Sequence, residues 1–375
     1  MFIKNLFLLN IYYMTSDVKR LFDLDVQIPP IPDPKPEALG RGNPVVGQLC
    51  PTSSLGLIGD KVNWEYANAV VIAEKGPKTV SRATSTSPSP NDFADASSPT
   101  RIPSPPPTVI VSAFEEDESF HAESKAFHLV RRISGVVQAL AINTGSRQII
   151  QEDAGISLDC WRMGGGLSGR SYAERIFILY AIASTILRFH YSGLAHQDLK
   201  PENIGVQNDG VPRIFDLGSM VRLKDIKKKG GNTCVSSPAY YPPTGRNFSM
   251  RSSPKQHDVY SLGVTIYEVM TKKYWSGQLV SQLKLEGNVD DIARAFVNCT
   301  TQEHITNIIE NVDVEDIGPD LKDLLKKMLV LVPEKRITIK KVVKAMGKLQ
   351  LYASFSAPLT KKGKPTFEER IGTAV

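Results

Sequence analysis

The feature that most constrains this chain is a run of polar residues near its middle, HQDLKPENI at positions 196–204. In an extended segment alternate side chains point to the same side, so Asp198 and Lys200 are expected to lie together. A carboxylate can accept a proton from a hydroxyl group while a neighbouring ammonium stabilises negative charge. The run therefore predicts a catalytic loop, because these side chains at this spacing suit proton transfer beside an anion.

Two further residues supply oxygen atoms of the kind that a hard divalent cation prefers. Asn203 stands near the end of the run, and Asp216 opens a second motif, DLG at 216–218. Amide and carboxylate oxygens bind Mg2+, which usually shares its coordination sphere between one or two carboxylates and phosphate groups. A base, a cation and two metal ligands are together what phosphoryl transfer from ATP requires.

The two motifs resemble the catalytic loop and the metal-binding DFG-type motif of protein kinases. This resemblance implies a bilobal α+β fold, with a small, mostly β N-terminal lobe and a large helical C-terminal lobe. It also implies an ATP-dependent serine/threonine protein kinase that acts on protein hydroxyls. In such an enzyme Asp198 is the base and Lys200 the nearby cation, while Asn203 and Asp216 hold Mg2+ against ATP.

Composition sets the domain boundaries that we expect. Residues 1–54 should form a tail and a proline-rich linker, and residues 352–375 a second tail. The kinase-like domain should span 55–351, with a disordered insert at 77–107, since that tract is dense in serine, threonine and proline and poor in aromatic residues. The apolar run at the N-terminus is short and interrupted by asparagines, so a plain tail and a signal peptide both stay open.

Overall composition is that of a globular protein of 375 residues, with 22% charged and 41% hydrophobic residues. The net charge of +6 is modest for this length and does not argue for a nucleic-acid partner. The four cysteines are far apart in the sequence, which favours reduced thiols in the cytoplasm or nucleus. We expect no membrane-spanning segment, and the sequence leaves the oligomeric state open.

The glycine-rich loop of the kinase family has only a weak counterpart. Gly56 and Gly59 match the last two glycines of its GxGxxG pattern, at the start of a hairpin predicted from two strands, 57–66 and 67–73. Gly59 is thus the candidate phosphate-binding glycine, since a side chain there would block close approach of the backbone. The GRGNPVVG segment at 40–47 is an alternative candidate.

The β-branched segment 108–114 predicts a buried strand that resembles the third strand of kinases. The match places Ser112 where the family has its phosphate-binding lysine. Glu123, on a helix expected at 119–133, takes the place of that lysine's usual glutamate partner. Some kinases without this lysine bring the cation from a neighbouring strand or from the glycine loop. The candidates here are Lys61, Lys75 and Lys78.

The remaining strands of the small lobe are expected at 136–142 and 148–151. They lead to a hinge in which the backbone at Glu152 and Ala154 would bind adenine. The large lobe should contain a helix at 172–191, whose apolar residues recur at helical spacing. Its last helix is expected at 338–348.

Other positions in the large lobe match or depart from the family pattern. Asp258, on the helix expected to form the floor of this lobe, should hold the backbone of the catalytic loop. Gln197 replaces the arginine that binds an activating phosphate. Thr244 replaces the glutamate that pairs with an arginine, here Arg336, which must then find another acceptor. Ser237 would border the substrate hydroxyl.

Three interpretations are therefore open. The first is an active kinase, because Asp198, Lys200, Asn203 and Asp216 are all present. The second is a pseudokinase that serves as a scaffold or an allosteric nucleotide-binding module, because Ser112 cannot supply the charge of a lysine. The third is an unrelated protein or a small-molecule phosphotransferase, which the kinase-like segment PAYYPP at 238–243 disfavours.

Overall fold

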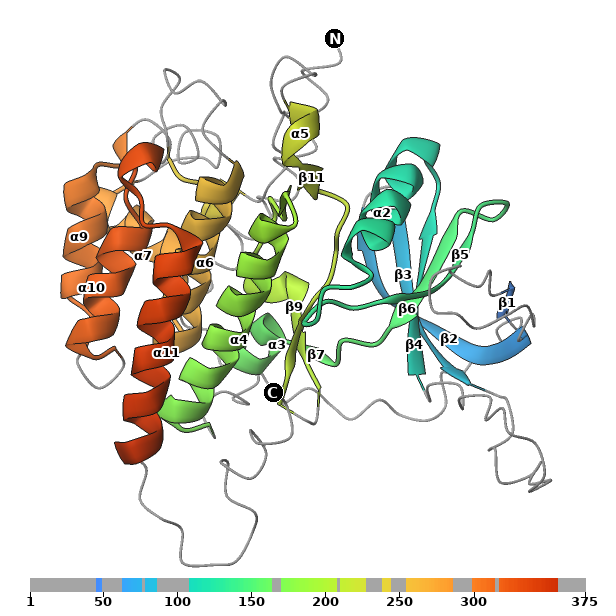
Figure 1. The fold of residues 1–375 in the computed structure, drawn as a ribbon, viewed down its shortest axis with the longest axis horizontal. Helices are drawn as coiled ribbons and strands as arrows, with labels where there is room; N and C mark the ends of the chain where they lie inside the picture. The colour runs from blue at the N-terminus through green and yellow to red at the C-terminus, as the bar shows by residue number, and fades with distance from the viewer. Residues whose placement is uncertain are drawn as a thin grey trace, which may run out of the picture.

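A sheet with one long helix and a body of helices form two lobes that are connected by a short segment (Figure 1). The computed structural model describes residues 45–48, 63–75, 78–85, 108–163, 170–207, 210–226, 238–243, 254–285, 299–313 and 317–356. Within these residues, the fold is of the α+β class with a small β lobe and a large helical lobe, as the sequence predicts.

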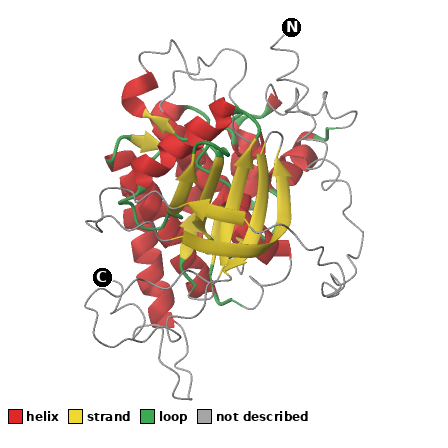
Figure 2. Ribbon diagram, turned by 90° about the vertical axis from the view of Figure 1, so that its right-hand side faces the viewer, coloured by secondary structure: helices red, strands yellow, loops and turns green. Residues whose placement is uncertain are grey.

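The small lobe contains a six-stranded sheet in which neighbouring strands are antiparallel and follow the order β1-β2-β3-β4-β6-β5. Its elements are β1 (Val45–Gln48), β2 (Asn63–Lys75), β3 (Lys78–Ser85), β4 (Thr108–Phe114), helix α2 (Asp117–Val130), β5 (Ala139–Asn143) and β6 (Gln148–Glu152). The strands stand together in the view of Figure 2.

The two faces of this sheet carry different apolar groups, because side chains alternate along each strand. Val109, Val111 and Ala83 belong to a small cluster on one face. Phe114 and Ile149 belong to the main core, together with the buried aromatic side chains of α2. The second face is thus the one that packs on α2.

The large lobe consists mainly of helices. Its elements are β7 (Ile156–Ser157), α3 (Leu158–Met163), α4 (Tyr172–Tyr191), β8 (Leu194–Ala195), η3 (Pro201–Asn203), β9 (Ile204–Val206), β10 (Pro212–Ile214), β11 (Val221–Arg222), α5 (Leu223–Ile226), η4 (Pro238–Tyr240), α6 (Pro254–Thr271), α7 (Trp275–Leu283), α9 (Gln302–Glu310), α10 (Pro319–Met328), η5 (Pro333–Lys335) and α11 (Ile339–Ser356). Its short strands include β7, which directly follows the connection to the sheet.

Local sequence explains the start of α4 and the burial of α6. Ser171 caps α4 through a capping box with Glu174, which satisfies backbone donors that the first turn leaves unpaired. Every residue of α6 from His257 to Thr271 is buried, which suits a helix at the centre of the lobe. None of the helices in the described part of the chain combines the length and apolar character that a bilayer span needs.

Several predicted elements have the bounds that the sequence indicates, and others are wrong. β4 and α4 match the predicted ranges 108–114 and 172–191. The turn expected between strands at 57–66 and 67–73 is wrong, because one continuous strand, β2, runs from Asn63 to Lys75. Residues 57–62 lie outside the described residues. The residues of β4 and α4 themselves indicate where these elements begin and end, whereas the end of β2 depends on its pairing with β3.

The predicted domain boundaries also need correction where the structure describes them. β1 lies within the predicted tail 1–54, yet it pairs with β2 in the sheet. β3 occupies the start of the predicted insert 77–107, and α11 continues beyond the predicted boundary at 351. The rest of the insert, residues 86–107, lies outside the described residues. Of the cysteines, Cys160 and Cys299 are free and exposed.

Candidate functional site

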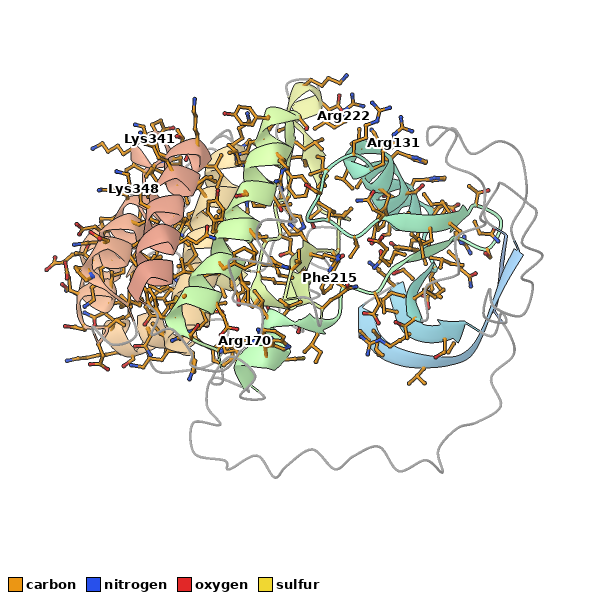
Figure 3. All side chains as sticks on the ribbon, turned by 60° about the horizontal axis from the view of Figure 1, so that its bottom comes forward. Arg131, Arg170, Phe215, Arg222, Lys341 and Lys348 are labelled. Carbon is orange, nitrogen blue, oxygen red and sulfur yellow. The ribbon has the colours of Figure 1, made fainter. Side chains whose placement is uncertain are left out.

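A lysine on the sheet meets two carboxylates that come from distant parts of the chain. The Lys78 Nζ lies 2.6 Å from the Glu123 Oε2 on α2 and 3.4 Å from the Asp216 Oδ1, which follows β10. In Figure 3 Phe215, the residue before Asp216, lies between the two lobes. These contacts place an ammonium group beside a predicted metal ligand.

The surroundings of Lys78 keep its ammonium charged. Its side chain is largely buried, and its Nζ also lies 5.3 Å from the centre of the Phe114 ring. Burial by itself would lower the pKa of Lys78, but attraction to Asp216 and Glu123 outweighs this and raises the pKa above its usual value. Lys78 therefore carries a positive charge that Glu123 and Asp216 hold in place.

Ser112 lies one strand away, at the position where the family pattern has its lysine. In the register of the sheet, Val80 pairs with Ser112 and Lys78 pairs with Phe114. Paired and alternate side chains project from one face, so Lys78 and Ser112 share a face. The buried Oγ of Ser112 finds no hydrogen-bond partner among the described residues. The Lys78 ammonium thus projects from the same face of the sheet as Ser112, one strand away.

The catalytic loop brings three predicted site residues together. The Lys200 Nζ lies 3.2 Å from the Asp198 Oδ2, and the Asn203 Nδ2 donates to the same oxygen at 3.0 Å and to the Asp198 backbone carbonyl at 2.9 Å. Burial would lower the pKa of Lys200, but attraction to Asp198 outweighs it and the pKa is raised. Asp198 is thus held between an ammonium and an amide.

The backbone of this loop is fixed by Asp258 of α6, which confirms the predicted structural role of that residue. The Asp258 carboxylate accepts from the backbone N–H of His196 at 2.9 Å and of Gln197 at 2.8 Å, and it contacts the His190 Nε2 at 2.9 Å. Burial alone would raise the pKa of Asp258, but these partners, His190 first, lower it. Gln197 has a φ of 71°, which is uncommon for a residue with a side chain, and its Nε2 donates to the Pro254 carbonyl.

The predicted hinge connects β6 to β7 and packs closely on the large lobe. The backbone N–H of Glu152 donates to the Gln138 carbonyl, and its side chain accepts from the Gln138 N–H. Ala154 is buried, and a Cβ on Gly205 of β9 would lie 2.4 Å from its carbonyl oxygen. Gly205 therefore permits a close backbone approach between hinge and large lobe.

Arg336 finds acceptors other than a glutamate, as predicted. Its guanidinium donates to the carbonyls of Val330, Leu331 and Gln256 and lies over the Tyr260 ring. Burial lowers the pKa of Arg336 to about 10. Backbone carbonyls thus satisfy the guanidinium that Thr244 cannot pair with. Thr244, Ser237 and Gly59 lie outside the described residues, so their predicted roles are not described.

The donor set fits Mg2+ bound jointly with phosphate groups. The Asn203 Oδ1 is fully buried and has no hydrogen-bond partner among the described residues, so it remains free to coordinate a cation. Asp216 supplies a carboxylate next to Phe215, whose backbone N–H donates to the Asn203 carbonyl. Asp216 has a φ of 60°, which aspartate tolerates better than most residues. Lys78 supplies positive charge for the phosphates.

Lys78 carries only a general signal in the sequence, where it is one of three candidate lysines. The turn-forming pair Gly76-Pro77 precedes it, and Val80 fits a strand. The final register pair of the hairpin, Lys75 with Lys78, places the lysine at the start of β3. Lys61 lies outside the described residues. The contacts of Lys78 depend on α2 and on residues more than a hundred positions away, which no local pattern reveals.

The chain is similar to known proteins over part of its length. Residues 157–346 match a family model described as "Protein kinase domain". The chain is 33% identical over 156 residues to the serine/threonine-protein kinase stk11 of Xenopus laevis, which covers 41% of this chain and 32% of that protein. It is 26% identical over 250 residues to a putative mitogen-activated protein kinase 14C of Drosophila melanogaster, covering 61% of this chain and 69% of that protein. The chain thus spans about a third of the length of the first of these relatives.

Proposed function

Because the chain belongs to the protein kinase family, we propose that it transfers the γ-phosphoryl group of ATP to serine or threonine hydroxyls of proteins. The observation that carries this proposal is the contact of Lys78 with both Glu123 and Asp216. Through this contact Lys78 would supply the positive charge that a serine at position 112 cannot. Similarity to serine/threonine-protein kinases supports the choice of hydroxyl.

In this proposal Asp198 accepts the proton of the attacking hydroxyl. Lys200 contacts Asp198 and offers a nearby ammonium to the transferring phosphoryl group, while Asn203 fixes the carboxylate by donating to it. Asp258 holds the backbone of the loop, so the base keeps its orientation. Such preorganisation lowers the barrier because little rearrangement is needed as charge develops.

The nucleotide would lie between the sheet and the large lobe. Asn203 and Asp216 would hold Mg2+, which when bound neutralises phosphate charge and orients the phosphoryl group. Lys78 would bind phosphate oxygens, and its pairing with Glu123 would fix the ammonium in place. The backbone of the hinge, at Glu152 and Ala154, would bind adenine.

The segment that begins at Pro238 would form the binding surface for a protein substrate. Tyr240 lies against α6, where the Ser261 Oγ donates to its carbonyl and its hydroxyl donates to the Glu268 Oε2 at 2.7 Å. The Tyr240 hydroxyl also lies 3.5 Å from Glu202, next to the loop that carries Asp198. The segment from Pro238 is thereby anchored beside the catalytic loop, where it can form a docking surface for a peptide.

The test is transfer of labelled γ-phosphate from ATP to a generic protein substrate by the purified full chain with Mg2+. We expect phosphoserine and phosphothreonine in the substrate, and a loss of at least about a hundredfold in the Asp198→Asn variant. Equal labelling by the parent and by Asp198→Asn would contradict the proposal.

The alternative is a pseudokinase that binds nucleotide or a partner without transfer. Its specific support is Ser112 at the lysine position and Gln197 in place of arginine. The contacts of Lys78 weaken the first of these arguments. Tight Mg2+-ATP binding without any Asp198-dependent transfer would favour the pseudokinase.

A further inference from the structure

A second ion pair connects β3 to the hinge. The Arg82 Nε lies 2.8 Å from the Asp153 Oδ2, and the Arg82 Nη2 donates to the Asp153 Oδ1 at 3.2 Å. The two residues are 71 positions apart in sequence. The Nη2 hydrogen bond is charge-assisted, and such bonds are stronger than those between neutral groups. We name Arg82 and Asp153 the hinge ion pair.

Asp153 is joined to the large lobe as well as to the sheet. Its backbone carbonyl accepts a hydrogen bond from the Gln207 Nε2, just after β9. Its Oδ1 also accepts from the Gly155 N–H at 2.9 Å. Gly155 has a φ of 84°, and a Cβ there would lie 2.4 Å from the Val206 carbonyl oxygen. The main chain of the hinge is thus held by the large lobe while the Asp153 carboxylate reaches the sheet.

β3 therefore carries an ion pair at each end of the candidate nucleotide site. Lys78 and Arg82 are four residues apart on one strand, so their side chains project from the same face about 13 Å from each other. Lys78 contacts the carboxylates at the phosphate end, and Arg82 contacts the hinge at the adenine end. The strand between them lies over the space that the nucleotide would occupy.

We propose that the hinge ion pair positions β3 over the adenine end of the nucleotide site and thereby sets the affinity for Mg2+-ATP. This inference rests on the proposed function, and it adds two positioning residues that do not themselves react. Breaking the pair removes the side-chain contact between β3 and the hinge, so the nucleotide has to order the hinge against the sheet when it binds. The consequence is weaker binding of nucleotide with little effect on transfer once ATP is bound.

A rival explanation is that the pair is one of many surface ion pairs of little consequence. Arg82 is 42% exposed, but Asp153 is only 15% exposed. The small lobe offers a matched control in Arg147, which is also 42% exposed and lies 3.1 Å from the 72% exposed Asp117. This second pair connects the turn between β5 and β6 to α2 and does not touch the hinge.

The experiment compares the full chain with Arg82→Ala, Asp153→Asn, the double variant and Arg147→Ala. We expect Arg82→Ala and Asp153→Asn each to raise the Kd and the KM for Mg2+-ATP about tenfold, with kcat within twofold. The double variant should be no worse than either single variant, because the residues act as one pair. Arg147→Ala should bind as the parent does.

Two further measurements distinguish positioning from a general loss of structure. The charge-reversed variant R82D/D153R should recover part of the lost affinity. Amide hydrogen exchange of residues 150–157 in the nucleotide-free protein should be faster in Arg82→Ala than in the parent or in Arg147→Ala.

Unchanged Kd in Arg82→Ala, or additive losses in the double variant, would overturn the role of the hinge ion pair while leaving the proposed kinase function intact. Failure of the parent protein to bind Mg2+-ATP would overturn both. An equal fall in the unfolding midpoint and in affinity for Arg82→Ala and Arg147→Ala would overturn the positioning role, since it would show a general effect of surface ion pairs.

Discussion

Lys78 lies at the start of β3, and its ammonium contacts carboxylates from α2 and from the segment after β10. In the family pattern this charge comes from the next strand, where this chain has Ser112. The two positions share one face of the sheet, so the same space can receive an ammonium from either strand. We therefore expect phosphate binding to depend on the position of the charge and not on the strand that supplies it.

Replacing Lys78 by methionine should therefore lower kcat/KM about a hundredfold to a thousandfold, because the phosphates lose a desolvated cation. Lys61→Met and Lys75→Met serve as matched controls and should change it little. The measurement is the steady-state rate of ATP-dependent phosphorylation.

Ser112→Lys in the Lys78→Met background should restore part of the activity, since it puts an ammonium in the family position. Full activity of Lys78→Met alone would show that Lys78 does not serve the phosphates.

Glu268 offers a second test at the residue scale, because it is a carboxyl group enclosed in the core. It accepts from the Tyr240 hydroxyl at 2.7 Å and from the backbone N–H of Trp275 at 2.9 Å. Burial raises the pKa of Glu268 from 4.5 to about 7, so the folded protein holds a proton that the unfolded chain has lost. The contribution of Glu268 to the free energy of unfolding is thus greatest below pH 4.5 and falls as the pH rises to about 7.

Glu268→Gln should remove this dependence. The free energy of unfolding of the variant minus that of the parent should increase by about 3 kcal/mol from pH 4.5 to pH 7. Above pH 7 this difference should stay constant. His257, whose pKa burial lowers to about 4, contributes in the opposite direction, so the difference between variant and parent is the quantity to measure. Urea unfolding from pH 5 to pH 8, with the exposed Glu303→Gln as control, gives this difference. A constant difference across that range would contradict the raised pKa.

At the scale of elements, Arg336 joins α6 to the segment between α10 and η5. Its guanidinium donates to the carbonyls of Val330 and Leu331 and to that of Gln256 on α6. These carbonyls are buried acceptors that lose their partner if the guanidinium is removed. The contact is therefore structural, and it does not depend on Thr244.

We expect Arg336→Met to lower the free energy of unfolding by about 3 kcal/mol. The exposed neighbour Lys335→Met should change it by less than about 0.5 kcal/mol. Chemical denaturation followed by circular dichroism measures both values. A similar small effect of the two substitutions would show that water replaces the guanidinium without cost.

The elements also show what sequence alone can reveal. α4 was predictable because its apolar residues recur at helical spacing, and β4 was predictable because β-branched residues dominate a short run. β3 was assigned in part to a disordered insert, because its serines and threonines resemble the tract that follows. Asp198, Lys200 and Asn203 were predictable as neighbours because they lie in one short run. The contact between Lys78 and Asp216, in contrast, depends on the packing of two lobes, which local patterns do not determine.

For the whole molecule, the candidate nucleotide site draws on both lobes. Lys78 and Glu123 come from the small lobe, and Asn203 and Asp216 come from the large lobe. A ligand that binds both should stabilise the folded chain by mass action, by about 2.7 kcal/mol at a hundred times its Kd. Mg2+ alone should do little, because it binds poorly to so few protein ligands.

The midpoint of thermal unfolding should accordingly rise by several degrees with Mg2+ and ATP together. Asp216→Ala should abolish this rise, whereas Asp323→Ala, a substitution of an exposed residue on α10, should keep it. If ATP raises the midpoint of thermal unfolding equally without Mg2+ and in Asp216→Ala, the result would instead favour the pseudokinase.

The carboxylates around Lys78 also govern its chemical reactivity. Acylation requires the neutral amine as the nucleophile, and Asp216 and Glu123 keep this amine protonated. Simple amine-reactive esters should therefore modify Lys78 slowly, and modification should be faster in Asp216→Ala. Because trypsin does not cleave after an acylated lysine, the tagged peptide should run from Gly76 to Arg82. The nucleotide-site lysine of this chain is thus to be sought on a peptide that ends within β3, well before the strand that carries Ser112.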